Sequence, residues 1–137
     1  MSTGSIEDQL AIRELIEQFC VGCMRADVEI WGNTWAEEAS WKIDMLDKPE
    51  VGKANVVAVY EKILSNIAFV SITSFPSDLT FDGDRASGKA YSQELIFPKA
   101  GGQKILVGCN HDEYIKRDGK WYFLSRVYET FWRAPIA

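Results

Sequence analysis

The sequence predicts a single α+β domain spanning residues 1–137, with helices first and an antiparallel sheet after them. Apolar residues recur at helical spacing in the first half of the chain, whereas the second half alternates apolar and polar residues as strands do. Short turn signals separate the strand-like stretches, which is typical of antiparallel hairpins. Helices segregated from such a sheet indicate the α+β class. We expect a curved sheet wrapped around a long first helix, enclosing a cone-shaped pocket for a small apolar ligand.

The first helix is predicted over residues 5–25, where apolar side chains lie three and four positions apart. Ser5 followed by Asp8 forms a capping-box-like start. The motif CVGC lies inside this helical pattern and contains Cys20 and Cys23. Its spacing suits a redox pair or half of a zinc site, but on a helix the simpler interpretation is the packing of two small apolar side chains.

A second, shorter helix is expected to start after Asp27 and to run through Trp31 and Trp35. The stretch SWKIDML after it favours a short strand. The stretch VGKANVVAVYEKILSN then predicts a third helix, because its apolar residues share one helical face.

Four strand-like stretches follow, rich in β-branched and aromatic residues. The signals DGD, PKAGG and RDG between them are typical of hairpin turns. Together they predict an antiparallel meander made of residues 69–81, 85–97, 104–116 and 120–132.

Composition narrows the function classes. A formal net charge of -5 and an isoelectric point near 4.9 disfavour binding to nucleic acid, whose phosphates would be repelled. No stretch approaches the roughly 20 apolar residues of a membrane span, and the N-terminus lacks the order of a signal peptide. The third cysteine, Cys109, makes the number of cysteines odd, which disfavours a disulfide framework. We therefore expect a cytoplasmic protein.

No metal and no cofactor are expected. A closed zinc site needs four ligands, and beyond the CVGC motif the sequence offers only Cys109 and the lone histidine, His111. One histidine and scattered cysteines do not complete such a site. The chemistry is therefore expected to use protein side chains alone.

Five stretches of the sequence carry a resemblance to a known family: AIRELIEQFC, WAEEASWKI, GKANVV, FDGDRASGKA and YIKRDGKWYFLSR. In order and spacing they resemble the SnoaL-like branch of the nuclear-transport-factor-2-like superfamily, over nearly the whole chain. The resemblance implies an apolar cone and cofactor-free proton transfer, as in scytalone dehydratase and hexachlorocyclohexane dehydrochlorinase. Relatives with this fold also include proteins that bind ligands without turnover.

The resemblance also assigns positions. In the dehydratase and the dehydrochlorinase, an aspartate near the end of the first helix orients a basic histidine on the strand after the third helix. The matching positions here are Met24 and Ser74, so both members of that dyad are missing. The second histidine of the dehydratase corresponds to Ile96. Any proton transfer must therefore use other side chains.

The lone histidine is expected to face away from the pocket. Successive side chains of a strand point to opposite faces, so His111 points opposite to its neighbours Asn110 and Asp112. The position matching Asn110 lies in the cavity of the relatives, which turns His111 outward. A structural role for His111 is favoured over the alternative of a catalytic one.

Three inward residues are the candidates for chemistry: Glu94, Asn110 and Arg126. Glu94 either has its pKa raised by desolvation, which makes it a general acid or base, or forms a structural ion pair with Arg126. Both interpretations stay open. Asn110 and Arg126 would polarise a substrate oxygen. For Asp112 a supporting role is favoured, with catalysis as the alternative.

The remaining pocket residues follow from strand alternation and from the resemblance. The lining would be apolar with a few convergent polar groups, and Tyr60 or Tyr128 would orient the substrate. We expect the ligand to contact Met24, Trp41, Tyr60, Ile72, Ser74, Ser92, Ile96, Asp112, Tyr128 and Trp132.

The leading hypothesis is a cofactor-independent lyase or isomerase acting on a small hydrophobic molecule, aromatic or polyketide-like. A ligand-binding protein without turnover is the main alternative, because the family's aspartate and histidine are absent. A purely structural dimerisation module is a third hypothesis. A homodimer through the outer sheet face is expected from family habit and from the apolar outer residues Ile105, Val107 and Cys109.

Overall fold

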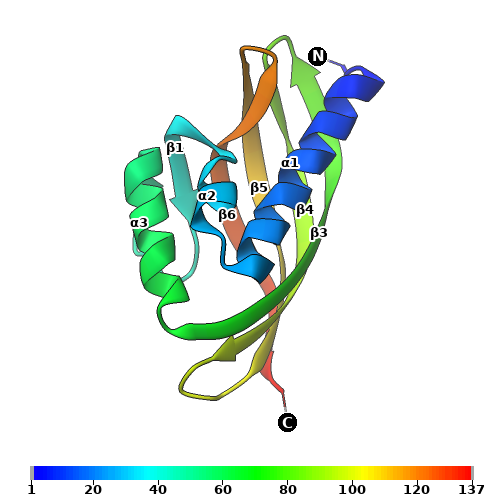
Figure 1. Ribbon diagram of the computed structural model, residues 1–137. Helices are drawn as coiled ribbons and strands as arrows, with labels where there is room; N and C mark the ends of the chain where they lie inside the picture. The colour runs from blue at the N-terminus through cyan, green and yellow to red at the C-terminus, as the bar shows by residue number, and fades with distance from the viewer. Residues whose placement is uncertain (1, 137) are drawn as a thin grey trace.

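The computed structural model describes residues 2–136 and shows a curved sheet with helices packed on one face (Figure 1). The helices are α1 (Ile6–Arg25), α2 (Val28–Gly32) and α3 (Lys53–Leu64). None of the helices within residues 2–136 is long and apolar enough to cross a bilayer. The strands are β1 (Trp35–Lys42), β2 (Glu50–Val51), β3 (Ile67–Asp82), β4 (Arg85–Pro98), β5 (Lys104–Arg117) and β6 (Lys120–Pro135). In Figure 1 α1, in blue, lies across β3, and α3, in green, flanks β1. The predicted α+β class is confirmed.

The sheet holds six strands in the order β2-β1-β6-β5-β4-β3, and it is mixed rather than wholly antiparallel. β3 to β6 form the predicted meander, and β2 runs antiparallel to β1. β1 pairs with β6 in parallel, so the antiparallel prediction is wrong for this one pair. β1 and β6 are far apart in sequence and no hairpin joins them, so turn signals carry no information about their relative direction.

The start of α1 follows its capping motif, and the helix is then fastened to the sheet. The Ser5 hydroxyl accepts a hydrogen bond from the Asp8 N–H at 3.0 Å. The Asp8 carboxylate accepts from Trp121 Nε1 at 2.9 Å and from Lys116 Nζ at 3.2 Å. The N-terminal turn of α1 is thereby held against the hairpin between β5 and β6.

The second helix is shorter than predicted, because α2 ends at Gly32 and Trp35 begins β1. The Thr34 hydroxyl donates to the Trp31 carbonyl at 2.7 Å, just past the helix end. Trp31 and Trp35 are both buried, and their spacing of four residues also fits one face of a helix. The prediction from periodicity therefore made the helix too long. β1 therefore starts before the predicted stretch 40–46, and the short β2 was not predicted.

Aromatic side chains form the core between the helices and the sheet. Trp31 stacks on Tyr60 with ring centroids 3.9 Å apart, and Trp35 and Trp41 pack against Trp31. Phe19 of α1 packs on the same ring at 5.4 Å. Large rings bury the most apolar surface per residue, so this cluster ties α1, α2, α3 and β1 into one unit.

Candidate functional site

The pairing register divides the side chains of β4 to β6 between two faces. Ser92 and Glu94 of β4 share a face with Asn110 of β5 and with Arg126 and Tyr128 of β6, because cross-strand partners point the same way. We call this the inner face, since α1 packs on it. Residues that alternate with these lie on the outer face. Buried polar groups therefore gather on the inner face, under the first helix.

A buried ion pair joins β5 to β6 on the inner face. Arg126 donates through Nε to Asp112 Oδ1 at 2.8 Å and through Nη2 to Asp112 Oδ2 at 3.0 Å. Their side chains are 1% and 0% exposed. The guanidinium also lies 4.0 Å from the ring centroid of Phe123 and 4.5 Å from that of Phe19. A bidentate pair between aromatic rings is held rigidly in place.

Asp112 is held by Tyr114 as well as by Arg126. Tyr114 donates its hydroxyl to Asp112 Oδ2 at 2.8 Å. Burial, and then the Asp112 charge, raise the pKa of Tyr114 well above its ordinary value, so this hydroxyl keeps its proton. The proposed ion pair between Arg126 and Glu94 is not formed, because Asp112 lies directly opposite Arg126 in register whereas Glu94 lies two strands away.

Glu94 lies on the inner face between Ile72 of β3 and Leu106 of β5. Its side chain is partly exposed, and within residues 2–136 its carboxylate has no hydrogen-bond or ion-pair partner. Burial raises the pKa of the Glu94 carboxyl to about 7, against the lowering effect of the Arg126 and Lys104 charges. Glu94 therefore exists in both protonation states near neutral pH.

Three hydroxyls on this side of the sheet are buried and make no well-aligned hydrogen bond in the described part of the chain, those of Tyr60, Ser92 and Tyr128, although Tyr60 lies beside the Cys23 thiol and Tyr128 lies beside Ser92. Burial raises the pKa of Tyr128 to about 12 and raises the pKa of Tyr60 above its ordinary value, and the Glu94 charge adds to both shifts. All three are protonated donors at neutral pH. An unpaired buried hydroxyl costs about 1 to 3 kcal/mol, which a polar ligand atom could recover.

Asn110 lies on the same face, buried between Ala90 and Tyr128. Its amide has no side-chain hydrogen bond among residues 2–136. Gly108, two residues earlier on β5, lets the Tyr128 ring lie across the strand, because a Cβ at position 108 would come within 2.6 Å of Tyr128 Oη. The Asn110 amide and the Tyr128 hydroxyl are therefore neighbouring polar groups on the inner face, which also carries Glu94.

His111 faces outward, as strand alternation and the family resemblance together predict. Its side chain is 47% exposed, and its Nε2 lies 2.8 Å from Glu129 Oε1 on the outer face. The inner face therefore holds no histidine.

The other residues predicted to contact the ligand lie in different parts of the structure, and only some of them are on the inner face of the sheet. Ile72, Ser74 and Ile96 are inward, and Ser74 donates its hydroxyl to the Tyr91 carbonyl at 2.9 Å. Trp41 is buried in the aromatic core, and Met24 lies at the end of α1 with 36% of its surface exposed.

The predicted inward position of Trp132 is wrong. A β-bulge between Val107 and Gly108 pairs Gly108 with Thr130 and Val107 with Trp132, so Phe131 is an extra residue on β6. Thr130 stays inward, but Trp132 moves to the outer face and is 64% exposed.

Two features near the site were not predicted from the sequence: the closeness of two cysteines to Glu94 and the contacts of Asp44. Cys20 and Cys23 of α1 are buried close to Glu94: burial raises the pKa of their thiols to about 11 and about 12, and the Glu94 charge contributes to both shifts. Asp44, after β1, accepts hydrogen bonds from Thr130 and Arg133 at the end of the inner face. The spacing of the CVGC motif predicted only that the two cysteines share one face of α1. No local sequence pattern predicts that Asp44 contacts β6.

Two open hollows lie elsewhere on the surface. The larger, of about 430 Å³, lies among α1, α2 and the turn between β5 and β6, and Leu15, Thr34 and Trp121 are part of its lining. The smaller, of about 190 Å³, lies where the β3–β4 hairpin meets Tyr114. Neither is lined by Glu94 or by the hydroxyls of Tyr60, Ser92 and Tyr128, so neither is part of the inner-face site.

The sequence profile of the SnoaL-like domain family matches residues 4–127 of the chain. A search of the curated proteins found no significant match.

Several solved structures share the fold. A hexachlorocyclohexane dehydrochlorinase of type 2 superposes with a TM-score of 0.87 at 18% identity, covering 96% of this chain and 90% of that one. The type 3 enzyme from Novosphingobium barchaimii gives 0.84 at 17% identity, with 96% and 92% covered. A protein provisionally assigned as a scytalone dehydratase, from Novosphingobium aromaticivorans, gives 0.84 at 16% identity, with 96% and 89% covered. At these identities the likeness establishes the fold alone.

Proposed function

The chain belongs to the SnoaL-like domain family, and on that premise we propose that it is a cofactor-independent lyase or isomerase for a small hydrophobic molecule of aromatic or polyketide type. The observation that carries the proposal is Glu94, an unpaired inner-face carboxylate whose pKa burial raises to about 7. A carboxylate with such a pKa accepts a proton and returns it near neutral pH. The aromatic core around Tyr60 supports the hydrophobic character of the substrate.

Each inner-face group has a role in this chemistry. Glu94 removes a proton from a carbon atom of the substrate. In an elimination the electron pair then expels a leaving group from the adjacent carbon, and in an isomerisation the proton returns to a different atom. Asn110 donates a hydrogen bond to a substrate oxygen, and the hydroxyls of Tyr60 and Tyr128 orient the ring.

Arg126 takes a less direct part than the sequence indicated. Its Nε and Nη2 are occupied by Asp112, so it polarises no substrate oxygen through those atoms. Its charge instead lowers the pKa of Glu94 from the value that burial alone would set. Arg126 is therefore a positioning residue that tunes the base.

The names of two structural neighbours agree with this class. Dehydrochlorination and dehydration are both eliminations that need a proton transfer. The position of the base would differ from theirs, since Met24 and Ser74 occupy the positions that the family resemblance assigns to the aspartate and histidine. The same absence favours the second candidate function, a small-ligand-binding protein without turnover.

The test is solvent-deuterium incorporation into a panel of aromatic ketones, hydroxylated polycyclic aromatics and halogenated cyclohexanes, followed by mass spectrometry. We expect Glu94→Gln to lower the rate of turnover or exchange about a hundredfold or more. Gln93→Ala, one residue away and exposed on the outer face, is the matched control and should match the wild type. For a base, kcat/KM rises with pH through about 7.

The outcomes separate the candidates. Equal rates in the wild type and Glu94→Gln would remove Glu94 as the base. Binding of panel compounds without exchange or product in the wild type would support the ligand-binding alternative.

A further inference from the structure

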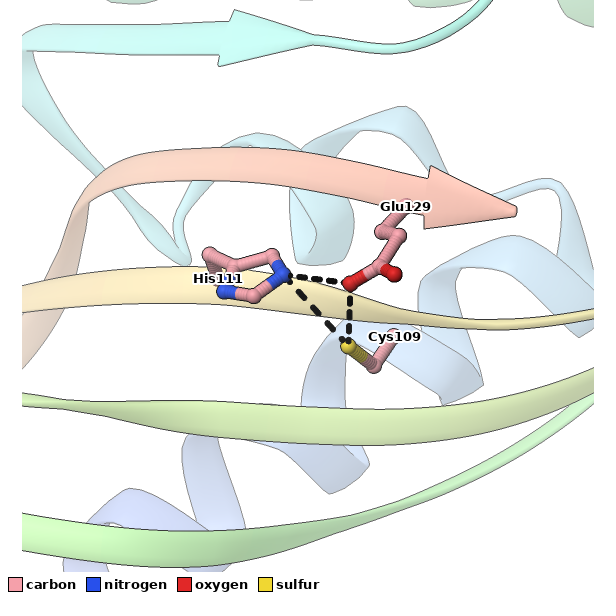
Figure 2. Close-up of side chains that lie close together, drawn as sticks. All are labelled: Cys109, His111 and Glu129. Atoms are coloured by element: carbon pink, nitrogen blue, oxygen red, sulfur yellow. Dashed lines mark hydrogen bonds and ion pairs between the residues drawn. The ribbon is translucent and has the colours of Figure 1, made fainter. Parts of the chain in front are cut away.

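A second cluster of chemically active side chains lies on the outer face, away from the candidate active site. Cys109 and His111 are two residues apart on β5 and so share a face, and Glu129 of β6 lies directly opposite Cys109 in register. Figure 2 shows the thiol, the imidazole and the carboxylate turned toward one another over β5.

The three ligand atoms lie close to one another. His111 Nε2 is 2.8 Å from Glu129 Oε1, and Cys109 Sγ is 3.8 Å from each of these two atoms. A tetrahedral zinc ion at its usual bond lengths separates such atoms by roughly 3.3 to 3.6 Å. The imidazole and the carboxylate need to part by roughly 0.5 Å, and the sulfur needs to approach by roughly 0.3 Å. Side-chain rotation of the exposed His111 and Glu129 provides these shifts.

We propose that Cys109, His111 and Glu129 form a binding site for a borderline divalent transition-metal ion, with Zn²⁺ or Co²⁺ as the fitting class. A thiolate and an imidazole select such ions over Mg²⁺ or Ca²⁺, which prefer oxygen ligands alone. The thiolate and the carboxylate together neutralise the charge of a divalent ion. The fourth coordination position is left to water, because the three protein ligands all come from one side.

The surroundings of the cluster explain how it stays accessible and what opposes the ion. Cys109 is buried, but His111 and Glu129 are about half exposed, so an ion reaches the sulfur between them. The cation beside the cluster is Lys89, which pairs with His111 in register and whose Nζ lies 3.9 Å from Asp78 Oδ2. Asp78 offsets part of the Lys89 charge. Binding releases the thiol proton to solvent, because the thiolate is the ligand.

The number and spacing of cysteines and histidines in the sequence did not predict this site. The sequence showed Cys109 and His111 as an isolated pair, and the missing ligand is a carboxylate that only the register of β5 with β6 brings alongside. The site is independent of the proposed catalysis, because strand alternation places its side chains on the face opposite Asn110 and Glu94.

The experiment uses the purified full chain, reduced and freed of metal with a chelator that is then removed. Titration with Co²⁺ should produce a thiolate-to-cobalt charge-transfer band that saturates at one ion per chain, and calorimetry with Zn²⁺ should give the same stoichiometry. Cys109→Ser should abolish the band. His111→Ala and Glu129→Gln should each weaken Zn²⁺ binding about tenfold or more.

Three further variants act as controls. Cys20→Ser combined with Cys23→Ser removes the other two thiols, which lie on α1, and should leave the band unchanged. Lys89→Met removes the opposing charge and should tighten Zn²⁺ binding. His111 is exposed, so His111→Ala tests the site even where Cys109→Ser folds poorly. Absence of the band in the wild type, or Zn²⁺ binding of wild-type strength in His111→Ala, would overturn the proposal.

Discussion

On each face of the sheet a carboxylate pairs with a nitrogen-bearing side chain across β5 and β6, and the two pairs have the same length. On the inner face Arg126 Nε lies 2.8 Å from Asp112 Oδ1, with side chains 1% and 0% exposed. On the outer face His111 Nε2 lies 2.8 Å from Glu129 Oε1, with side chains 47% and 54% exposed. Distance therefore does not distinguish the pairs, but burial does, because only the inner pair has lost its water. We expect the inner pair to govern stability and the outer pair to be free for other chemistry.

The largest expected effect comes from breaking the inner pair. Asp112→Asn leaves the Arg126 guanidinium buried without its counter-ion and removes an acceptor from Tyr114. The free energy of unfolding should fall by about 3 to 5 kcal/mol. Glu129→Gln breaks the exposed pair and should change it by about 1 kcal/mol or less. Urea unfolding in chelator-containing buffer measures both, and equal losses would contradict the contrast between the faces.

The next largest effect is a pH dependence that belongs to the inner face. Because the pKa of Glu94 is about 7 in the fold and 4.5 ordinarily, the folded chain binds this proton more tightly than the unfolded chain does. Stability therefore falls as the pH rises from about 4.5 to about 7 and is then level. The loss should be about 2 to 3 kcal/mol. Glu94→Gln should lack this loss, so the difference between the two proteins, measured by urea unfolding at pH 5 and pH 8, isolates it.

Much of this contrast could be predicted from the sequence, and its failures have definite causes. Alternation placed Asn110 and His111 on opposite faces, the family resemblance assigned Asn110 to the inner one, and both hold because β5 has no irregularity between Gly108 and Glu113. The same reasoning failed for Trp132, where the bulge adds one residue to β6. A bulge carries no sure sequence signal, so parity holds only within an uninterrupted ladder.

The cross-strand partner of a residue was harder to predict than the face of the sheet on which its side chain lies. Alternation correctly gave Glu94 and Arg126 the same face, but it could not say that Asp112 lies opposite Arg126. Register depends on hairpin geometry and bulges, which sequence patterns locate only within a few residues. The parallel pairing of β1 with β6 and the carboxylate of the outer cluster were missed for the same reason.

The outer face also differs from the inner face in its exposed aromatic side chains. Phe75, Tyr91 and Phe131 form a row with ring centroids 5.7 and 6.0 Å apart, next to the exposed Trp132. A contiguous exposed apolar patch on a small protein marks an association surface. In place of Ile105, Val107 and Cys109, which the sequence suggested, we expect this patch to be the part of the outer face that packs against a second copy.

Replacing Phe131 with serine should weaken that dimer by about 2 kcal/mol, roughly thirtyfold in dissociation constant. Met45→Ser is the control, because Met45 is 73% exposed but lies in the segment after β1. Light scattering in chelator-containing buffer over micromolar concentrations measures the change. A wild-type chain that stays monomeric would end the dimer hypothesis.

The smallest expected effect compares two adjacent residues of β5, one on each face. Asn110→Ala removes an inward amide that has no side-chain partner among the described residues, and the ligand then loses one hydrogen bond worth about 1 kcal/mol. The affinity for whichever panel compound binds should fall about fivefold, measured by calorimetry without added metal. His111→Ala removes an outward side chain, so it should leave that affinity within twofold while it weakens Zn²⁺ binding about tenfold or more. Because the two residues share one strand, a strand shifted by one residue would exchange the two results: ligand affinity would then depend on His111, and the metal ligand would be lost from the outer face.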